Sequence, residues 1–156
     1  MNSVAILNFV NLFFAGLLAG TLFIIDYGVG RAIVTVADEQ SQIQMRQALI
    51  RPLRVLVPAI FIPTILSGIA ITALNGSDQG FGFRCAGAVL VVACFVLTLV
   101  GTAPINKAIG SWQAGAPPKH WRTLISRWER LDKIRTWVGI TSFALFLAAT
   151  IVKLTA

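Results

Sequence analysis

Charged residues are scarce in this sequence, at 12% of 156 residues, whereas a soluble domain carries roughly 25%. Hydrophobic residues make up 56% of the chain, and the mean hydropathy is +0.80. A chain with so few polar side chains cannot cover the water-exposed surface of a soluble domain. The composition therefore indicates an integral membrane protein, and residues 1–156 are too few for more than one domain.

Metal-ligating and disulfide-forming residues are also few. His120 is the single histidine, and Met1 and Met45 offer it no partner ligands. A bis-histidine haem, a copper site or a non-haem iron triad each needs more imidazole groups than this chain has. Cys85 and Cys94 lie nine residues apart on one expected helix, too far apart to form a disulfide. We therefore expect no metal, no cofactor and no disulfide framework.

Acidic residues number only 6 against 13 lysines and arginines, which gives a net charge of +7. Nucleic-acid binding is one interpretation of so basic a chain, but the apolar fraction favours the positive-inside bias of a membrane protein. Segments 26–54 and 106–135 hold eleven of these cations, and Arg84 and Lys153 are the other two. This distribution predicts a bacterial inner-membrane protein with both basic segments in the cytoplasm, against anionic lipid headgroups, and both termini outside.

Four long apolar runs are present, close to the length of about 20 residues that crosses a hydrocarbon core of roughly 30 Å. They cover residues 4–25, 55–74, 85–105 and 136–152. The last is short, but Trp137 and Lys153 can anchor its two ends. The pattern predicts an all-α integral membrane four-helix bundle. Pro58 and Pro63 predict kinks in the second span, which serve either to open a cavity or to adjust the helix's shape.

Polar and aromatic residues cluster between the last two runs. Residues 121–135 are expected to be helical and to continue into the fourth span, so that Trp128, Asp132 and Arg135 share one stripe. Asn106 ends the third span and is expected to meet this cluster. Asn11 lies inside the first span, where an amide needs a partner in the bundle interior. These five residues are the candidate site, and the alternative is an interfacial ion pair, an interface anchor and packing asparagines.

Three sequence motifs carry a resemblance to a known family. They are Asn11 with FFAG at 13–16, PIN at 104–106, and W-x-x-L-x-x-R-W-x-x-x-D-x-x-R from Trp121 to Arg135. In this order and spacing they resemble the anthrone-oxygenase-like family of small four-span membrane proteins. Fungal members are linked to the oxidation of polyketide anthrones to anthraquinones. The family is expected to carry His or Asn where this chain has Asp132.

The resemblance implies a cofactor-independent oxygenase that binds or oxidises a hydrophobic aromatic or quinone-like molecule. Asp132 is the candidate base, and Arg135 and the indole N–H of Trp128 are the candidate donors to the resulting oxyanion. Asn11 and Asn106 are candidates for hydrogen bonds to a substrate carbonyl. A planar apolar substrate is expected to enter from the bilayer.

Two other function classes remain in view. Proton-coupled transport is disfavoured because no acidic residue lies inside any of the four apolar runs, with Asp26 at the edge of the first. A non-catalytic structural or accessory subunit of a larger membrane complex, or a homo-oligomer, fits a compact apolar bundle with few polar groups. Copurification with a stoichiometric partner distinguishes an accessory subunit from a stand-alone enzyme.

Overall fold

The computed structural model describes residues 3–36, 38–113 and 115–155, and these residues form helices joined by short turns, with no strand among them. In chain order the elements are α1 (Ser3–Phe23), the π-helical turn η1 (Ile24–Gly30), α2 (Arg31–Val36), α3 (Glu39–Asn75), α4 (Phe81–Leu97), the π-helical turn η2 (Thr98–Thr102), α5 (Ala103–Gly110) and α6 (Trp121–Thr155).

These elements make four helical rods, each long and apolar enough to cross a membrane. They are Ser3–Thr35, Glu39–Asn75, Phe81–Ser111 and Trp121–Thr155. The prediction of an all-α, multi-pass membrane bundle is thereby confirmed. The rods are longer than the four apolar runs because much of the polar sequence between the runs is helical too. The short fourth run, for example, belongs to the 35-residue helix α6.

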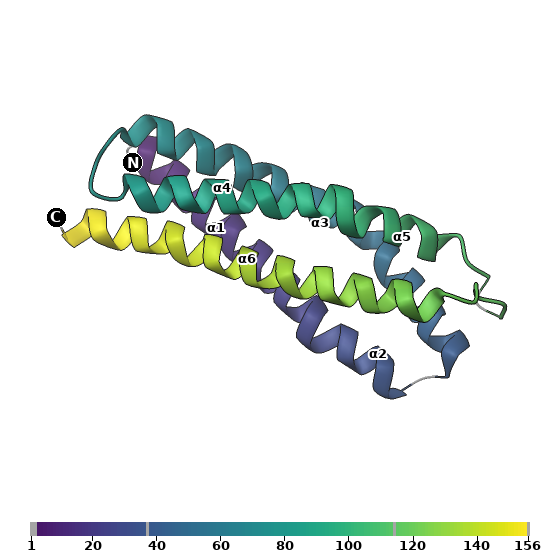
Figure 1. The fold of residues 1–156 in the computed structure, drawn as a ribbon. Coiled ribbons are helices and arrows are strands. Elements are labelled where there is room, and N and C mark those ends of the chain that lie inside the picture. The colour runs from purple at the N-terminus through teal and green to yellow at the C-terminus, as the bar shows by residue number, and fades with distance from the viewer. Residues whose placement is uncertain (1–2, 37, 114, 156) are drawn as a thin grey trace.

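The two ends of the bundle differ in what they contain (Figure 1). Both chain termini and the 76–80 turn between α3 and α4 lie at one end, here called the terminal end. The end of α2, the start of α3 and the residues between α5 and α6 lie at the other, here called the basic end because segments 26–54 and 106–135 reach it.

Helix α3 remains one helix although it contains Pro52, Pro58 and Pro63. Asp38 caps its start, since the Ser41 backbone N–H donates to the Asp38 carboxylate over 2.9 Å. The prolines therefore do not end the helix. In a bundle, neighbouring groups tolerate the lost backbone hydrogen bonds.

Glycines let the rods approach closely around one phenylalanine. Phe146 of α6 is 2% exposed, and its ring lies against Gly68 of α3 and Gly87 of α4. A Cβ atom at Gly68 would stand 2.9 Å from this ring, and one at Gly87 would stand 3.1 Å from it. On α1, Gly16 packs against Phe143 of α6, whereas a Cβ atom at Gly20 would meet nothing within 4 Å. Small residues thus set the helix spacing here, as in many membrane bundles.

The outward face of the bundle is apolar. Large hydrophobic side chains with more than half of their surface exposed occur on all four rods, among them Phe9, Val55, Val89 and Ile151. With lipid tails as the solvent such a face costs nothing, because the helices satisfy their own backbone hydrogen bonds. The buried polar groups therefore stand out, and several of them gather at two places.

Candidate functional site

A pocket of about 430 Å³ lies near the basic end, between α3, the η2–α5 segment and α6. This volume falls in the usual range of small-molecule sites, roughly 300–1,000 Å³. Its apolar wall includes Leu53, Val57, Pro58 and Phe95. Pro58 thus borders a cavity, whereas Pro63 is not part of this wall. The combination of an apolar wall with a few polar groups is typical of sites for hydrophobic ligands.

Four of the five candidate residues line this pocket, namely Asn106, Trp128, Asp132 and Arg135. Asn106 comes from α5, and the other three come from α6 at the predicted i, i+4 and i+3 spacings. Helical spacing in the sequence placed Trp128, Asp132 and Arg135 on one face, and the structure adds Asn106 from another helix. Their chemical roles stay predictions.

Asp132 and Arg135 form a buried ion pair. Nη1 of Arg135 donates to Oδ1 of Asp132 over 2.8 Å and also lies 3.2 Å from Oγ1 of Thr102. The residues are 1% and 5% exposed. The second carboxylate oxygen of Asp132 and Nε of Arg135 have no hydrogen-bond partner among the described residues. The pair thus retains one acceptor and one donor that are buried and unpaired, and its two residues line the pocket.

The indole of Trp128 is held on two sides. Its Nε1–H donates to Oδ1 of Asn106 over 2.8 Å, and the guanidinium of Arg46 lies 5.5 Å from the ring centroid. Arg46 is itself buried and pairs with Glu129 at 2.7 Å. Because the indole N–H of Trp128 already donates to Asn106, it can donate to a substrate oxyanion only after this hydrogen bond breaks. Asn106 has no described acceptor for its amide N–H₂, so it is the better placed donor of the two.

Asn11 does not line this pocket. It is 1% exposed, and its amide donates to Oγ of Ser67 at 3.2 Å and to the Thr64 carbonyl at 3.4 Å. These contacts join α1 to α3 about two helical turns from Pro58. The structure therefore does not bring Asn11 together with Asn106, and a contact between Asn11 and substrate stays a prediction. In these contacts its amide holds two helices together, as an amide inside a membrane bundle must.

Four polar residues at the pocket, Arg54, Thr98, Thr102 and Lys107, were absent from the sequence-based candidates. Thr102 is fully buried and accepts from Arg135, while Arg54 and Lys107 line the wall nearer the basic end. Thr102 belongs to η2, a π-helical turn, and such turns are frequent at functional sites because they interrupt the regular backbone ladder. Thr98 and Thr102 share a face at i, i+4 spacing inside an apolar run. This spacing is the sequence feature from which Thr102 could have been predicted as a site residue.

Metal-ligating side chains do not gather in the part of the chain that the structure describes. No group of three or more His, Cys, Asp or Glu residues there is placed to hold a metal ion. Cys85 and Cys94 are both free thiols. The expectation that the protein works without a cofactor stays a prediction.

The fold and pocket define a class, a multi-pass membrane bundle with a ligand-sized pocket lined by a buried acid–arginine pair. A family comparison makes this more specific. The sequence model of the anthrone oxygenase family matches residues 45–145, about two thirds of the chain, and the chain belongs to this family. The matched region includes Asn106, Trp128, Asp132 and Arg135 and excludes Asn11. No curated protein and no solved structure matches the chain.

Proposed function

We propose that the pocket near the basic end binds a planar aromatic ketone of the anthrone type and oxidises it with O₂ to a quinone, without a resident cofactor. The observation that carries the proposal is the buried and unpaired carboxylate oxygen of Asp132, a residue that pairs with Arg135 and lines a largely apolar pocket. An apolar wall suits fused rings, and the ion pair supplies a base and a cation where an oxyanion forms.

The proposed reaction needs only O₂ as a co-reactant. Asp132 removes a proton from the methylene carbon between the rings, and the C–H electron pair becomes a phenolate that Arg135 and the Asn106 amide stabilise. O₂ forms a C–O bond at that carbon and takes up the proton, which gives a hydroperoxide. Loss of water, with the second methylene hydrogen, breaks the O–O bond and leaves a carbonyl. One O₂ is reduced by four electrons, and one water is released.

The test uses the purified protein in lipid nanodiscs with an anthrone as substrate. O₂ uptake and quinone absorbance are measured against the spontaneous rate. We expect Asp132→Asn to lower the catalysed rate by about 10²–10⁴, the usual contribution of a positioned base, and Arg135→Gln also to lower it. Asp38→Asn is the matched control, because it removes an acid outside the pocket and asparagine caps helices equally well.

Two outcomes contradict the proposal. Unchanged oxidation in Asp132→Asn removes this residue as the base. Absence of both oxidation and anthrone binding in the wild type removes the substrate class. Stoichiometric recovery with a second protein, together with no activity when alone, supports the accessory-subunit function instead.

The orientation in the membrane belongs to the same proposal. We place both basic segments in the cytoplasm of a bacterial cell, where they meet anionic headgroups of the inner membrane, and both termini outside. Lys119 lies exposed between α5 and α6 and is the reporter. Labelling with a membrane-impermeant amine reagent in intact cells is expected to leave it unmodified. Modification of Lys119 from outside would reverse the orientation.

A further inference from the structure

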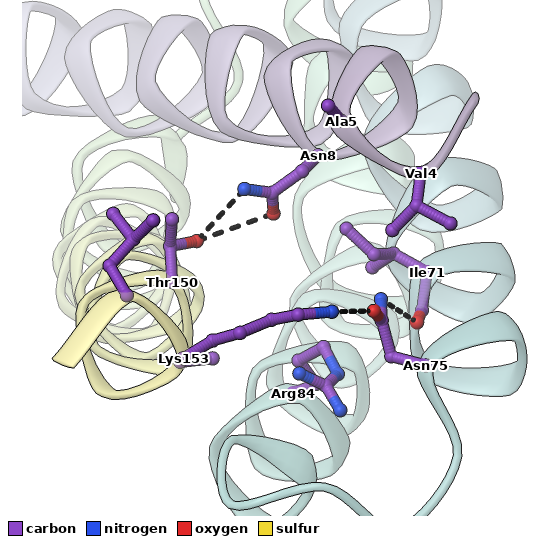
Figure 2. A pocket seen from close by; sticks show the side chains of 10 residues that line it. Val4, Ala5, Asn8, Ile71, Asn75, Arg84, Thr150 and Lys153 are labelled. Carbon is purple, nitrogen blue, oxygen red and sulfur yellow. Dashed lines mark hydrogen bonds between the residues drawn. The ribbon is translucent and has the colours of Figure 1, made fainter. Parts of the chain in front are cut away.

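A second pocket lies at the terminal end of the bundle, on the opposite side of the molecule from the proposed active site. It lies among α1, α3, α4 and α6 (Figure 2), and its volume is about 280 Å³. Its wall is mostly apolar, with contributions from Val4, Ala5, Ile71 and Leu154. This volume is close to the lower limit of about 300 Å³ for small-molecule sites, and it suits a headgroup with the start of one acyl chain.

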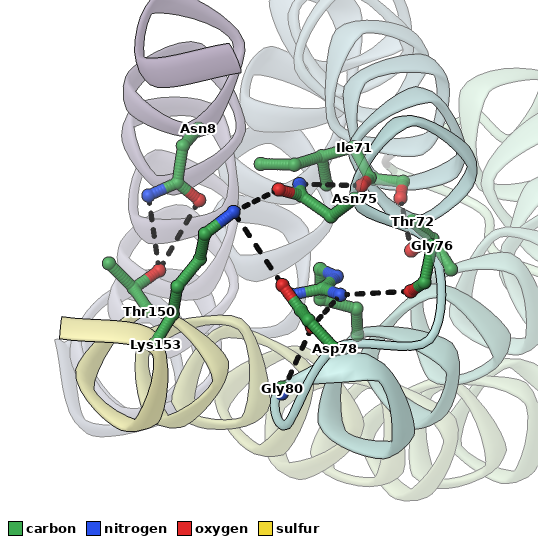
Figure 3. A network of polar contacts seen from close by, with 11 residues as sticks. Asn8, Ile71, Thr72, Asn75, Gly76, Asp78, Gly80, Thr150 and Lys153 are labelled. Carbon is green, nitrogen blue, oxygen red and sulfur yellow. Dashed lines mark hydrogen bonds and ion pairs between the residues drawn. The ribbon is translucent and has the colours of Figure 1, made fainter. Parts of the chain in front are cut away.

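Two cations reach this pocket from different helices. Arg84 of α4 is only 4% exposed, and Lys153 of α6 is about half exposed. Asp78, in the turn before α4, accepts a hydrogen bond from Arg84 and lies 3.5 Å from Nζ of Lys153 (Figure 3). One carboxylate between two cations leaves the cluster with a net charge of +1. Nε of Arg84 has no hydrogen-bond partner among the described residues.

Neutral donors complete the polar side of the pocket. Nδ2 of Asn8 lies 3.2 Å from Oγ1 of Thr150, so α1 and α6 are joined at this level (Figures 2 and 3). Asn75 of α3 bonds to Lys153 through its side-chain oxygen and to the Ile71 carbonyl through its amide. The pocket thus offers a half-exposed lysine that Asn75 and Asp78 hold, and a buried guanidinium with one unpaired N–H.

We propose that this pocket binds one anionic phospholipid, with its phosphate against Lys153 and Arg84 and the start of an acyl chain on the apolar wall. The net charge of +1 matches a phosphodiester, which carries one negative charge. The position fits as well, because the pocket lies at the end of four membrane-crossing helices, where headgroups are found. The site is independent of the proposed oxidation at the other end.

The test measures lipid retention by native mass spectrometry of the full chain in detergent micelles. Phosphatidylglycerol and phosphatidylcholine are offered at equal concentration, and inorganic phosphate is offered in a separate arm. We expect one phosphatidylglycerol per chain to be retained about fivefold more than phosphatidylcholine, since one cation near an anionic headgroup is worth about that factor. Lys153→Gln is expected to abolish this preference.

Two further variants separate charge from shape. Ala5→Trp fills the pocket from an exposed position of α1 and is expected to lower lipid retention without changing any charge. Lys119→Gln removes one cation at the basic end and is the matched control, in which the preference for one phosphatidylglycerol per chain at the terminal end is expected to persist. Circular dichroism confirms that each variant is folded.

Three results would overturn the proposal. Equal retention of the two lipids would show that the protein has no preference for an anionic headgroup. Unchanged retention in Lys153→Gln would show that the lipid does not bind in this pocket. Displacement of the lipid by inorganic phosphate at the same concentration leaves a plain anion site with no role for the apolar wall.

Discussion

The two ends of the bundle each hold a buried arginine paired with an aspartate, but the pairs are built differently. At the terminal end Asp78 comes from a turn and Arg84 from the first turn of α4, and the side chain of Asp78 is 28% exposed. Near the basic end Asp132 and Arg135 both come from α6, and the side chain of Asp132 is 2% exposed. Water therefore reaches one carboxylate and hardly touches the other.

The two ion pairs also differ in the structural elements that they connect. The Asp78–Arg84 pair closes the turn between α3 and α4, because Arg84 also bonds to the Gly76 carbonyl at 3.4 Å. The Asp132–Arg135 pair closes no turn, because both residues belong to α6, and Arg135 also bonds to Thr102 of η2. Burying an ion pair costs several kcal/mol of desolvation per ion, and an apolar pair is often as stable. Stability alone therefore does not account for the Asp132–Arg135 pair, which is why we propose a chemical role for it.

The largest expected effect tests this contrast at Arg135. Arg135→Met leaves Asp132 as an unpaired buried charge and is expected to destabilise the fold by about 3–5 kcal/mol. The double variant Asp132→Leu with Arg135→Met is expected to be at least as stable as the wild type, since no charge remains unpaired. Unfolding of each purified variant in mixed detergent–SDS micelles measures both changes. A double variant as unstable as the single one would make the pair structural and remove the contrast between the ends.

The sequence predicted the architecture because membrane folding leaves few choices. Apolar runs of bilayer length must be helices, and their number sets the bundle. The grouping of Trp128, Asp132 and Arg135 was also predictable, because helical spacing alone puts them on one face. Their position on one continuous helix, α6, follows from the same periodicity.

The contacts between helices were less accessible to sequence reasoning. Asn11 was assigned to the candidate site, but the rotation of α1 points it at Ser67 of α3. The indole N–H of Trp128 was a candidate donor to an oxyanion, but the approach of α5 gives it Asn106 as an acceptor. Arg84 was interpreted only as a charge outside the membrane, yet it is buried beside a second pocket. Each of these contacts depends on the rotation of one helix against another and on the distance between them. The sequence pattern within a single helix specifies neither.

A glycine substitution sharpens the comparison at the terminal end. A Cβ atom at Gly80 would lie 2.8 Å from the Ala149 carbonyl oxygen and 2.9 Å from Nη1 of Arg84. Gly80→Ala is therefore expected to cost about 1–3 kcal/mol of stability, as overpacking usually does, and to weaken the Asp78–Arg84 pair. Gly82→Ala is the control, because nothing lies within 4 Å of its added methyl group. Equal stability of the two variants would mean that this corner is loosely packed.

A smaller effect is expected from the indole hydrogen bond at the other end. Trp128→Phe keeps an aromatic ring against Arg46 but removes the N–H that bonds to Asn106. The expected loss is about 1 kcal/mol, the net value of an ordinary hydrogen bond. Trp137→Phe is the matched control, since this side chain is 54% exposed on the outer face. If both variants unfold at the same detergent composition, the Trp128–Asn106 bond does not order the pocket.

The smallest expected effect is a pH dependence specific to the terminal end. The guanidinium of Arg84 donates a hydrogen bond to Asp78 and holds the pKa of this carboxyl below its usual 3.8. The folded protein therefore binds this proton less tightly than the unfolded chain does. The stabilisation is fully present above the usual pKa and is lost as the pH falls through the lower pKa of the folded state. Thermal unfolding between about pH 5 and pH 3 is expected to show a steeper loss in the wild type than in Asp78→Asn. Identical pH profiles would mean that the Asp78–Arg84 ion pair does not form in solution. Asp132–Arg135 would then be the only one of these two ion pairs that persists.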